Sequence, residues 1–373
     1  MTLLHRTEAG LPAAWYYDPD HYRRELTNIW YRDWVAVGRA EDIARPGDYF
    51  VAEIGEQRLI ITRATDGSVK AFHDTCRHRG SSLCTVARGR FANGRIVCPY
   101  HAWTYDLNGR LIATPVRIET PDFRLDDYVL YAAHVAEWGG FVFVTLAETP
   151  SEFAAYLGKD AAILEQWPLA EMISVRRETQ RLACNWKVYW ENYSECYHCP
   201  LLHPELCRVV PVYRHGVLDQ ADVPGGSARD LADPRPRVGP GLQTWTLDGH
   251  SSLPPIAGPD EATRALGMAF ATFTANMFVV GHPDYVRSVS MLPRGPEALE
   301  LTVDWLLPKA TAERHAAELD PVFELGRLVI AQDAEACERN QRGLKSLRHR
   351  HGVLVPQEQS VWEFHRWLHQ RLG

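Results

Sequence analysis

The sequence lacks a long hydrophobic run, and no stretch approaches the roughly 18 consecutive apolar residues that a membrane-spanning helix needs. The segment 1–17 also lacks the apolar centre of a secretory signal peptide. An excess of positive charge is missing as well, because 40 Lys and Arg stand against 47 Asp and Glu and give a net charge of −7. This balance argues against a dedicated nucleic-acid-binding protein. We therefore expect a cytoplasmic protein that binds neither nucleic acid nor a membrane.

Cysteine is scarce, since eight in 373 residues are too few for a disulfide framework. Nucleotide motifs are also missing: no GxGxxG follows a predicted strand, and there is no P-loop. Seven of the cysteines fall into two groups, namely Cys76, Cys84 and Cys98, and Cys184, Cys196, Cys199 and Cys207. In a reducing compartment, clustered cysteines with histidines nearby predict metal binding or catalysis.

The patterns along the chain predict three regions. Helical spacing of aromatic and aliphatic residues in 1–41 predicts an N-terminal helical segment that packs on the C-terminal half. Short β-branched and aromatic runs separated by turn signals predict a small all-β domain over 42–150. Helical and strand patterns mix in 151–373, where 222–262 is rich in Pro, Gly and Asp and predicts a long loop. The expected fold class is α+β.

The β region contains two similar short elements. Cys76 and His78 form one, and Cys98 and His101 form the other. Two thiolates and two imidazoles can hold a tetrahedral structural zinc, or a Rieske [2Fe–2S] cluster, in which Cys ligates one iron and His the other. Zinc sites usually pair the cysteines in one element and the histidines in another, whereas here each element supplies one of each. The spacing favours the cluster and leaves zinc as the alternative.

A second group of ligand residues follows in the mixed region. Glu195 and His198 are three positions apart, so we expect them to share one face of a helix over 188–199. His203 is five positions further, about 140° around an ideal helix. We expect Pro200 to break the helix and let His203 turn back toward His198. Two imidazoles and one carboxylate form the facial triad of non-haem iron oxygenases, which leaves positions open for O₂.

The carboxylate of such a triad must come from elsewhere in the chain. Asp333 lies in a predicted helix over 321–344, on a stripe that is otherwise apolar. The other members of that stripe are Val322, Gly326, Val329 and Cys337. A buried carboxylate needs a partner or a metal, but the pattern alone allows equally that Asp333 is a partly exposed helix acid.

Together these stretches resemble the Rieske non-haem iron oxygenases, the family of ring-hydroxylating oxygenase alpha subunits. The stretches that carry the resemblance are Cys76–Gly80, Cys98–Asp106, Asn185–Leu206 and Asp333–Leu344. It implies an all-β Rieske [2Fe–2S] domain over 42–150 and a helix-grip-like catalytic domain, with an antiparallel sheet and helices, over 151–373. Ala102 stands where the family often has Gly, so we expect no left-handed backbone conformation there.

The resemblance also implies the ligands. Cys76, His78, Cys98 and His101 would hold the cluster, and His198, His203 and Asp333 would hold a mononuclear Fe(II). Asn192 and Glu195 would belong to the catalytic set. In most of the family an Asp in place of Glu195 links the cluster His of one subunit to the iron His of its neighbour and carries electrons between them. Glu resembles the subgroup that acts on quaternary ammonium compounds such as glycine betaine, carnitine and stachydrine. Alternatively, Glu195 links the two histidines as the Asp does, through a longer side chain, and its identity does not indicate the substrate.

The implied function is the oxygenase component of a Rieske-type system. It would use O₂ to hydroxylate an N-methyl group, and the carbinolamine would collapse to an amine and formaldehyde. The chain has no flavin or nicotinamide motif, so a separate NAD(P)H-dependent reductase or ferredoxin must supply electrons, and the expected assembly is a homotrimer. Hydroxylation of an aromatic ring or aromatic acid by the same metal centres is the alternative. A pure electron-transfer protein and a zinc-stabilised binding module are the other classes that we consider.

A quaternary ammonium group has no N–H to donate, so its site must offer aromatic faces. The candidates in the C-terminal half are Trp190, Tyr193, Tyr213, Trp245, Phe270 and Phe273. Taken singly, each of them is more typical of a core residue than of an aromatic cage, and only as a group do they suggest a cage. A betaine carboxylate would further need an arginine or a hydroxyl group, and the sequence does not choose among Arg208, Arg214 and Arg287.

Overall fold

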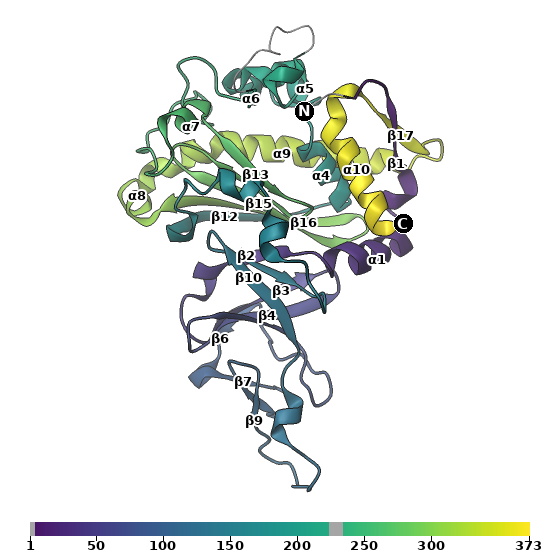
Figure 1. Cartoon of the computed structure of the whole chain (residues 1–373), viewed down its shortest axis with the longest axis vertical. Coiled ribbons are helices and arrows are strands. Elements are labelled where there is room, and N and C mark those ends of the chain that lie inside the picture. Colours follow the sequence, from purple (N-terminus) through teal and green to yellow (C-terminus); the bar gives the residue numbers. More distant parts are fainter. Residues whose placement is uncertain (1–3, 224–233) are drawn as a thin grey trace. The chain divides into compact units, whose positions relative to one another are not determined.

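The structure is a computed structural model that describes residues 4–223 and 234–373 (Figure 1). It divides into two compact units. The smaller unit is Ile29–Tyr156, and the larger joins Met1–Asn28 to Leu157–Gly373. Both sheets and helices are present, as expected for an α+β protein. Within the described ranges, no helix is long and apolar enough to cross a membrane.

The smaller unit is built on a seven-stranded antiparallel sheet with strand order β2-β11-β10-β5-β4-β3-β6. Its strands are β2 (Val35–Arg39), β3 (Asp48–Ile54), β4 (Gln57–Arg63), β5 (Val69–His73), β6 (Arg88–Arg90), β10 (Ala132–Trp138) and β11 (Phe141–Thr145). The sheet takes in β2, which precedes residue 42. The two-residue turn between β3 and β4 and the Asp66-Gly67 turn after β4 join neighbouring strands, so the local turn chemistry produces this meander.

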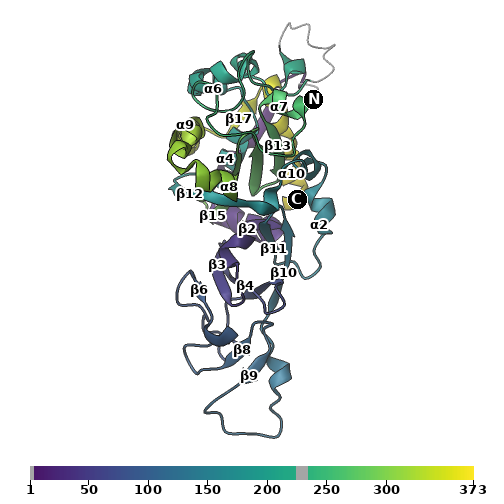
Figure 2. The ribbon, with the colours of Figure 1, turned by 90° about the vertical axis from the view of Figure 1, so that its left-hand side faces the viewer.

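A second, three-stranded sheet in this unit consists of β7 (Arg95–Val97), β8 (Thr104–Asp106) and β9 (Leu111–Ala113) (Figure 2). The stretch 98–103 connects β7 to β8, and 74–87 follows β5. Ile96, Tyr105 and Phe72 from the two sheets lie in one buried cluster with Cys76 and Cys98. Both Cys-and-His elements are therefore attached to the same hydrophobic core.

The larger unit is built on a five-stranded antiparallel sheet of order β12-β16-β15-β14-β13. Its strands are β12 (Met172–Leu182), β13 (Ala269–Phe273), β14 (Met277–Gly281), β15 (Val286–Gly295) and β16 (Ala298–Pro308). Residues 270–280 have the pattern of a single strand, but they form two. The amide of Asn276 donates to the Phe273 carbonyl at 3.1 Å and closes a turn that has no Gly or Pro to announce it.

Helices in the larger unit bring the second group of ligand residues to the sheet. α4 (Trp186–Tyr193) contacts both β15 and α9 (Leu319–Leu344) (Figure 1). The remaining elements are α1 (Pro19–Glu25), α3 (Asp160–Ile163), α5 (Cys199–Leu202), α6 (Pro204–Val209), α7 (Glu261–Leu266), α8 (Lys309–Arg314), α10 (Gln359–Leu372) and the strand pair β1 (Glu8–Pro12) and β17 (His351–Leu354). α2 (Phe153–Leu157) straddles the boundary between the units. Gly158, at φ +60°, separates α2 from α3, so this part of the chain forms two short helices in place of one.

A buried ion pair fastens the N-terminal segment to α4. Glu25 and Lys187 are both fully buried, and the Lys187 ammonium donates to the Glu25 carboxylate and, at 2.8 Å, to Asn185 Oδ1. Trp186 Nε1 donates to the other carboxylate oxygen at 2.8 Å. Burial by itself would raise the pKa of Glu25, but the ammonium and these hydrogen bonds outweigh it and lower the pKa. Both charges are therefore matched inside the core.

Candidate metal centres and active site

In the smaller unit, the structure brings the two Cys-and-His elements together. Cys76 and Cys98 are buried, whereas His78 is exposed and His101 is half-buried. The two imidazole rings lie 4.7 Å apart between centroids, and His78 stacks on Trp103 at 4.9 Å. The donor set thus has two thiols toward the core and two imidazoles toward the surface. This is the arrangement that a Rieske cluster requires, with cysteines on the inner iron and histidines on the outer iron.

Local contacts hold these ligand atoms in place. The Tyr105 hydroxyl lies 3.3 Å from Cys76 Sγ and accepts the Arg77 amide at 3.1 Å. Partial desolvation of the ring, together with the neighbouring His101 and Arg79, lowers the pKa of His78 and so favours the neutral imidazole that can ligate a metal. Burial raises the pKa of the Cys76 thiol, so the charge of a bound metal must drive its deprotonation.

The expectation for Ala102 is wrong, because its φ is +55°, in the left-handed region. Its amide donates to the Cys98 carbonyl at 3.0 Å, and the Cys98 amide donates to the Trp103 carbonyl at 2.8 Å. The stretch must curl tightly to present Cys98 and His101 on the same side, and this curl requires the left-handed residue. The conformation costs an alanine about 1–2 kcal/mol, which the surrounding contacts offset.

In the larger unit, α4 ends at Tyr193, so the helix expected over 188–199 is present only over 188–193 and does not reach Glu195 or His198. Ser194 Oγ donates back to the Trp190 carbonyl at 2.7 Å. The Glu195 carboxylate then accepts the amides of Tyr197 and His198, the latter at 3.2 Å, as an N-terminal cap would. Glu195 and His198 therefore meet across a turn rather than along a helix face.

The expected role of Pro200 as a helix breaker is wrong as well. Pro200 occupies the first turn of α5, where a proline is tolerated because its missing N–H has no partner there. The chain instead breaks at Ser194 and again at His203, whose φ and ψ are −123° and 58°. These two breaks turn the His203 imidazole toward His198.

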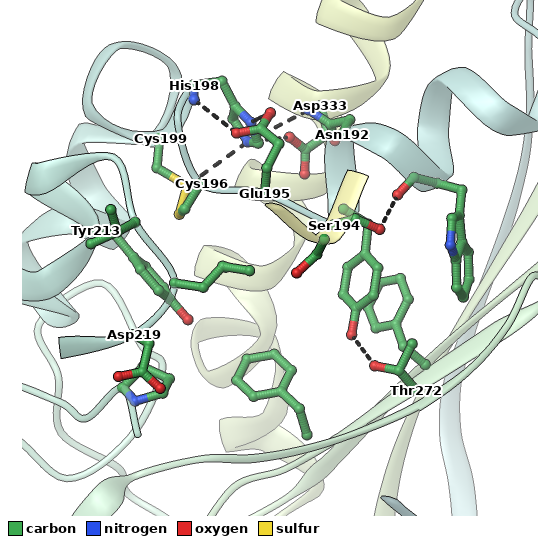
Figure 3. Close-up of a pocket in the computed structure, with 18 of the residues that line it drawn as sticks. Asn192, Ser194, Glu195, Cys196, His198, Cys199, Tyr213, Asp219, Thr272 and Asp333 are labelled. Carbon is green, nitrogen blue, oxygen red and sulfur yellow. Dashed lines mark hydrogen bonds and ion pairs between the residues drawn. A yellow bond between two sulfur atoms is a disulfide. The ribbon is translucent and has the colours of Figure 1, made fainter. Parts of the chain in front are cut away.

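The structure brings His198 and Asp333 together, the latter from α9 (Figure 3), and His203 joins them. Asp333 Oδ1 lies 2.9 Å from His203 Nε2 and 3.5 Å from His198 Nε2. His203 is almost wholly buried, and the side chains of His198 and Asp333 are 17% and 14% exposed, so this face of the site remains accessible. Two Nε2 atoms and one carboxylate converge as a facial triad for iron does.

The far nitrogen of each imidazole has its own acceptor. His198 Nδ1 lies 2.5 Å from Glu195 Oε1, and His203 Nδ1 lies 2.7 Å from Gln332 Oε1. An Nδ1–H that donates to these oxygens leaves Nε2 free to ligate a metal and sets the ring orientation. Sequence reasoning missed Gln332, although its place next to Asp333 was the available signal. Asn192 Nδ2 lies 3.5 Å from His198 Nε2.

Electrostatics favours a cation between these three residues. Burial would raise the pKa of Asp333, but its hydrogen bonds to the two histidines outweigh burial and lower the pKa. Burial would likewise lower the pKa of His198, but hydrogen bonds to Asp333 and Glu195 raise it to about 9. Without metal the site thus retains a proton in place of the missing positive charge. A divalent cation would displace that proton.

The second cysteine group does not supply metal ligands at this site. Cys196 and Cys199 form a disulfide, which the sequence did not predict (Figure 3). Cys199 Sγ lies 3.8 Å from His198 Nε2, but a sulfur in a disulfide is no thiolate. The disulfide closes the turn that carries His198 and restricts its position.

A cavity of about 710 Å³ adjoins the triad. Five of the six aromatic candidates line it: Trp190, Tyr193, Tyr213, Trp245 and Phe270. Phe273 is buried in the core instead. Figure 3 shows Glu195, His198 and Asp333 grouped at one side, with Tyr213, Asp219 and Thr272 set away from them. The cavity therefore combines aromatic walls, acidic residues such as Asp219 and a place for a metal.

Comparison with known families agrees with this architecture. The family described as "Ring hydroxylating alpha subunit (catalytic domain)" matches residues 169–373, and the "Rieske [2Fe-2S] domain" matches residues 33–124. Two compact units, one with a Cys₂His₂ set and one with a His₂Asp set, define a Rieske-type non-haem iron oxygenase. The chain belongs to the family of ring-hydroxylating oxygenase alpha subunits, and its cofactors are a Rieske [2Fe–2S] cluster and a mononuclear iron.

Particular relatives are similar over most of the chain. The glycine betaine monooxygenase oxygenase subunit of Chromohalobacter salexigens is 32% identical, over 92% of this chain and 81% of that protein. Chloroplastic choline monooxygenase of Beta vulgaris is 27% identical, over 97% of this chain and 76% of that protein. One solved structure shows the shared fold. It is a quaternary ammonium Rieske monooxygenase, reported for carnitine oxidation and inter-subunit electron transfer. Its TM-score is 0.77 at 21% identity, over 98% of this chain and 96% of that chain.

Proposed function

We propose that the protein is the oxygenase component of a system that removes an N-methyl group from a quaternary ammonium compound. The observation that carries the proposal is the aromatic-lined cavity next to the His198, His203 and Asp333 group. A quaternary ammonium offers no hydrogen-bond donor, so aromatic faces and nearby carboxylates are the groups that can bind it. The betaine, choline and carnitine enzymes among the similar proteins support the same substrate class.

The proposed reaction consumes O₂, two electrons and two protons. It inserts one oxygen atom into an N-methyl C–H bond and releases the other as water. The resulting carbinolamine then loses formaldehyde and a proton and leaves the tertiary amine. When bound, the mononuclear iron supplies O₂ activation. In this family a separate reductase delivers the electrons, and the chain has no flavin or nicotinamide motif of its own.

The side chains have separate tasks in this proposal. Cys76, His78, Cys98 and His101 hold the cluster, and His198, His203 and Asp333 hold the iron. Glu195 and Gln332 orient the two imidazoles through Nδ1, and Asn192 borders the iron-facing nitrogen of His198. Trp190, Tyr193 and Phe270 exclude water from the methyl groups, which limits side reactions.

The assembly follows from the electron path. We propose a homotrimer in which Glu195, through His198, receives electrons from the cluster histidines of the adjoining subunit. Residues 42–150, joined by β2, would act as the cluster domain and 151–373 as the catalytic domain, with 1–28 packed on the latter. We place this assembly in the cytoplasm, where a reductase and NAD(P)H are available.

Formaldehyde release tests the function. Iron-loaded protein with a surrogate reductase, NADH and O₂ would be offered glycine betaine, carnitine, proline betaine, choline and several aromatic acids. Formaldehyde formed in a one-to-one ratio with substrate consumed is the expected result for one of the ammonium compounds. Oxygen uptake with an aromatic acid, and none with any ammonium compound, would contradict N-demethylation and favour ring hydroxylation.

A further inference from the structure

Arg287 is a buried cation in the wall of the same cavity. It lies on β15, where it pairs with Val280 on β14 and Trp305 on β16, and only 4% of it is exposed. Its Nε and Nη1 atoms are buried without a hydrogen-bond partner. Among the described residues, no carboxylate forms an ion pair with it. Leaving a buried guanidinium unpaired is costly, so a partner that arrives from outside the chain is expected.

The groups around Arg287 stabilise the cation without neutralising it. Its guanidinium lies 5.3 Å from the centre of the Trp245 ring. The titratable groups on which its charge acts are Tyr189, Tyr193, Tyr213, His282 and Tyr285. Burial raises the pKa of each of these phenols, and burial together with Arg287 lowers the pKa of His282, so all five are neutral at physiological pH. None of these five groups is therefore an anion that could match the guanidinium.

The fold also leaves space for this side chain. Gly326 lies within α9, and a Cβ atom there would come within 3.0 Å of Arg287 Nη1. A glycine inside a helix costs about 1 kcal/mol relative to alanine. Room for the guanidinium explains why the helix tolerates this glycine. The other two arginines proposed from the sequence do not compete, because Arg208 is exposed and Arg214 Nε donates to the Cys207 carbonyl at 2.8 Å.

We infer that Arg287 is the anchor for a carboxylate of the substrate. The inference rests on the proposed function and narrows it: the quaternary ammonium compound is a betaine, which carries a carboxylate, rather than choline, which carries a hydroxyl group. A guanidinium presents parallel N–H donors that match the two carboxylate oxygens. Fixing one end of a small zwitterion also restricts which methyl group can reach the triad.

Binding to the metal-loaded holoenzyme under anaerobic conditions, measured by calorimetry, tests the inference without relying on turnover. The ligands are glycine betaine, choline and tetramethylammonium, which share the ammonium head and differ in the tail. Wild-type protein should bind glycine betaine about tenfold or more tightly than choline. Arg287→Met should weaken betaine binding at least about 30-fold and should change choline and tetramethylammonium binding less than about twofold.

Two further variants separate loss of the anchor from loss of the fold. Arg287→Lys retains the charge but lacks the parallel N–H donors of the guanidinium, so its betaine affinity should lie between those of wild type and Arg287→Met. Arg208→Met, on the exposed surface of α6, is the matched control and should bind all three ligands as wild type does. Circular dichroism and iron content establish that each variant is folded and loaded.

The outcomes distinguish this inference from the proposed function. Unchanged betaine binding in folded Arg287→Met and Arg287→Lys proteins, or a wild-type preference for choline, would overturn the anchor and leave N-demethylation standing. Benzoate binding that depends on Arg287, with no binding of any ammonium ligand, would support a carboxylate anchor and overturn the proposed function. Selective loss of betaine binding, together with formaldehyde release from betaine, supports both.

Discussion

The two proposed metal centres of this protein are built over very different chain distances. In the smaller unit, all four ligand residues lie within two short stretches attached to one core. In the larger unit, His203 and Asp333 are 130 residues apart and meet because α6, which begins directly after His203, packs against α9. A local motif can specify its geometry through turn chemistry, whereas a distributed site depends on the stability of the whole unit. The predictions below test this difference.

The largest expected effect comes from removing one ligand of each centre. Asp333→Ala should abolish mononuclear iron binding and turnover while leaving the cluster spectrum unchanged. Cys98→Ser should do the reverse and abolish the cluster while the larger unit still binds one iron. Iron and sulfide analysis with visible spectroscopy measures both. Turnover by Asp333→Ala protein at the wild-type rate would contradict the triad.

Lys187→Met should destabilise the larger unit by about 3–5 kcal/mol, because it leaves Glu25 buried without its counter-charge. Denaturant unfolding followed by tryptophan fluorescence measures the change, and Lys309→Met on the exposed surface of α8 is the control. The folded-state pKa of Glu25 lies below its ordinary value of 4.5. The pair's contribution is therefore fully present above pH 4.5 and is lost as the pH falls through the lowered pKa. Equal stability of the two variants would show that the pair contributes little.

Glu195→Ala should keep both metal centres and reduce turnover about 10–100-fold, because His198 loses the acceptor that orients its ring. Gln332→Leu should weaken iron binding to a similar degree through His203. Stopped-flow reoxidation of the reduced cluster separates slow electron transfer from slow chemistry. Rapid reoxidation and normal turnover in the Glu195→Ala protein would exclude the proposed bridge.

The smallest effect concerns the smaller unit alone. Ala102→Gly should stabilise it by up to about 1 kcal/mol, since glycine adopts the left-handed conformation without a Cβ clash but loses more entropy on folding. Loss of cluster absorbance during denaturant unfolding measures the change. Gly94→Ala, at φ +65°, is the reciprocal control and should destabilise the same unit. A destabilising effect of Ala102→Gly would mean that the alanine side chain contributes more than its strain costs.

Sequence reasoning was most accurate where short-range rules apply. The strands around the first ligand group follow from alternating residues and glycine turns, and the structure contains them as β3, β4 and β5. It failed at Ser194, where side-chain hydrogen bonds to the backbone end the helix early. It also failed at Ala102, which lies in a tight curl closed by backbone hydrogen bonds, and at Pro200, which lies in the first turn of α5. The pattern over 270–280 also conceals a turn, because the residues 274–276 between the two strands include neither Gly nor Pro.

The amino-acid sequence by itself determined the donor chemistry of this protein: two Cys-and-His elements, two further histidines and an acid on an apolar helix stripe. Residue identity and spacing carry that information because ligand preference is a property of single side chains. Only the tertiary structure decided that Gln332 positions His203, that Cys196 pairs with Cys199, and that Arg287 lacks an anionic partner. The positions of Gln332 and Arg287 depend on which distant segments pack together. Cys196 and Cys199 are only three residues apart, and their pairing depends on the turn that replaces the expected helix.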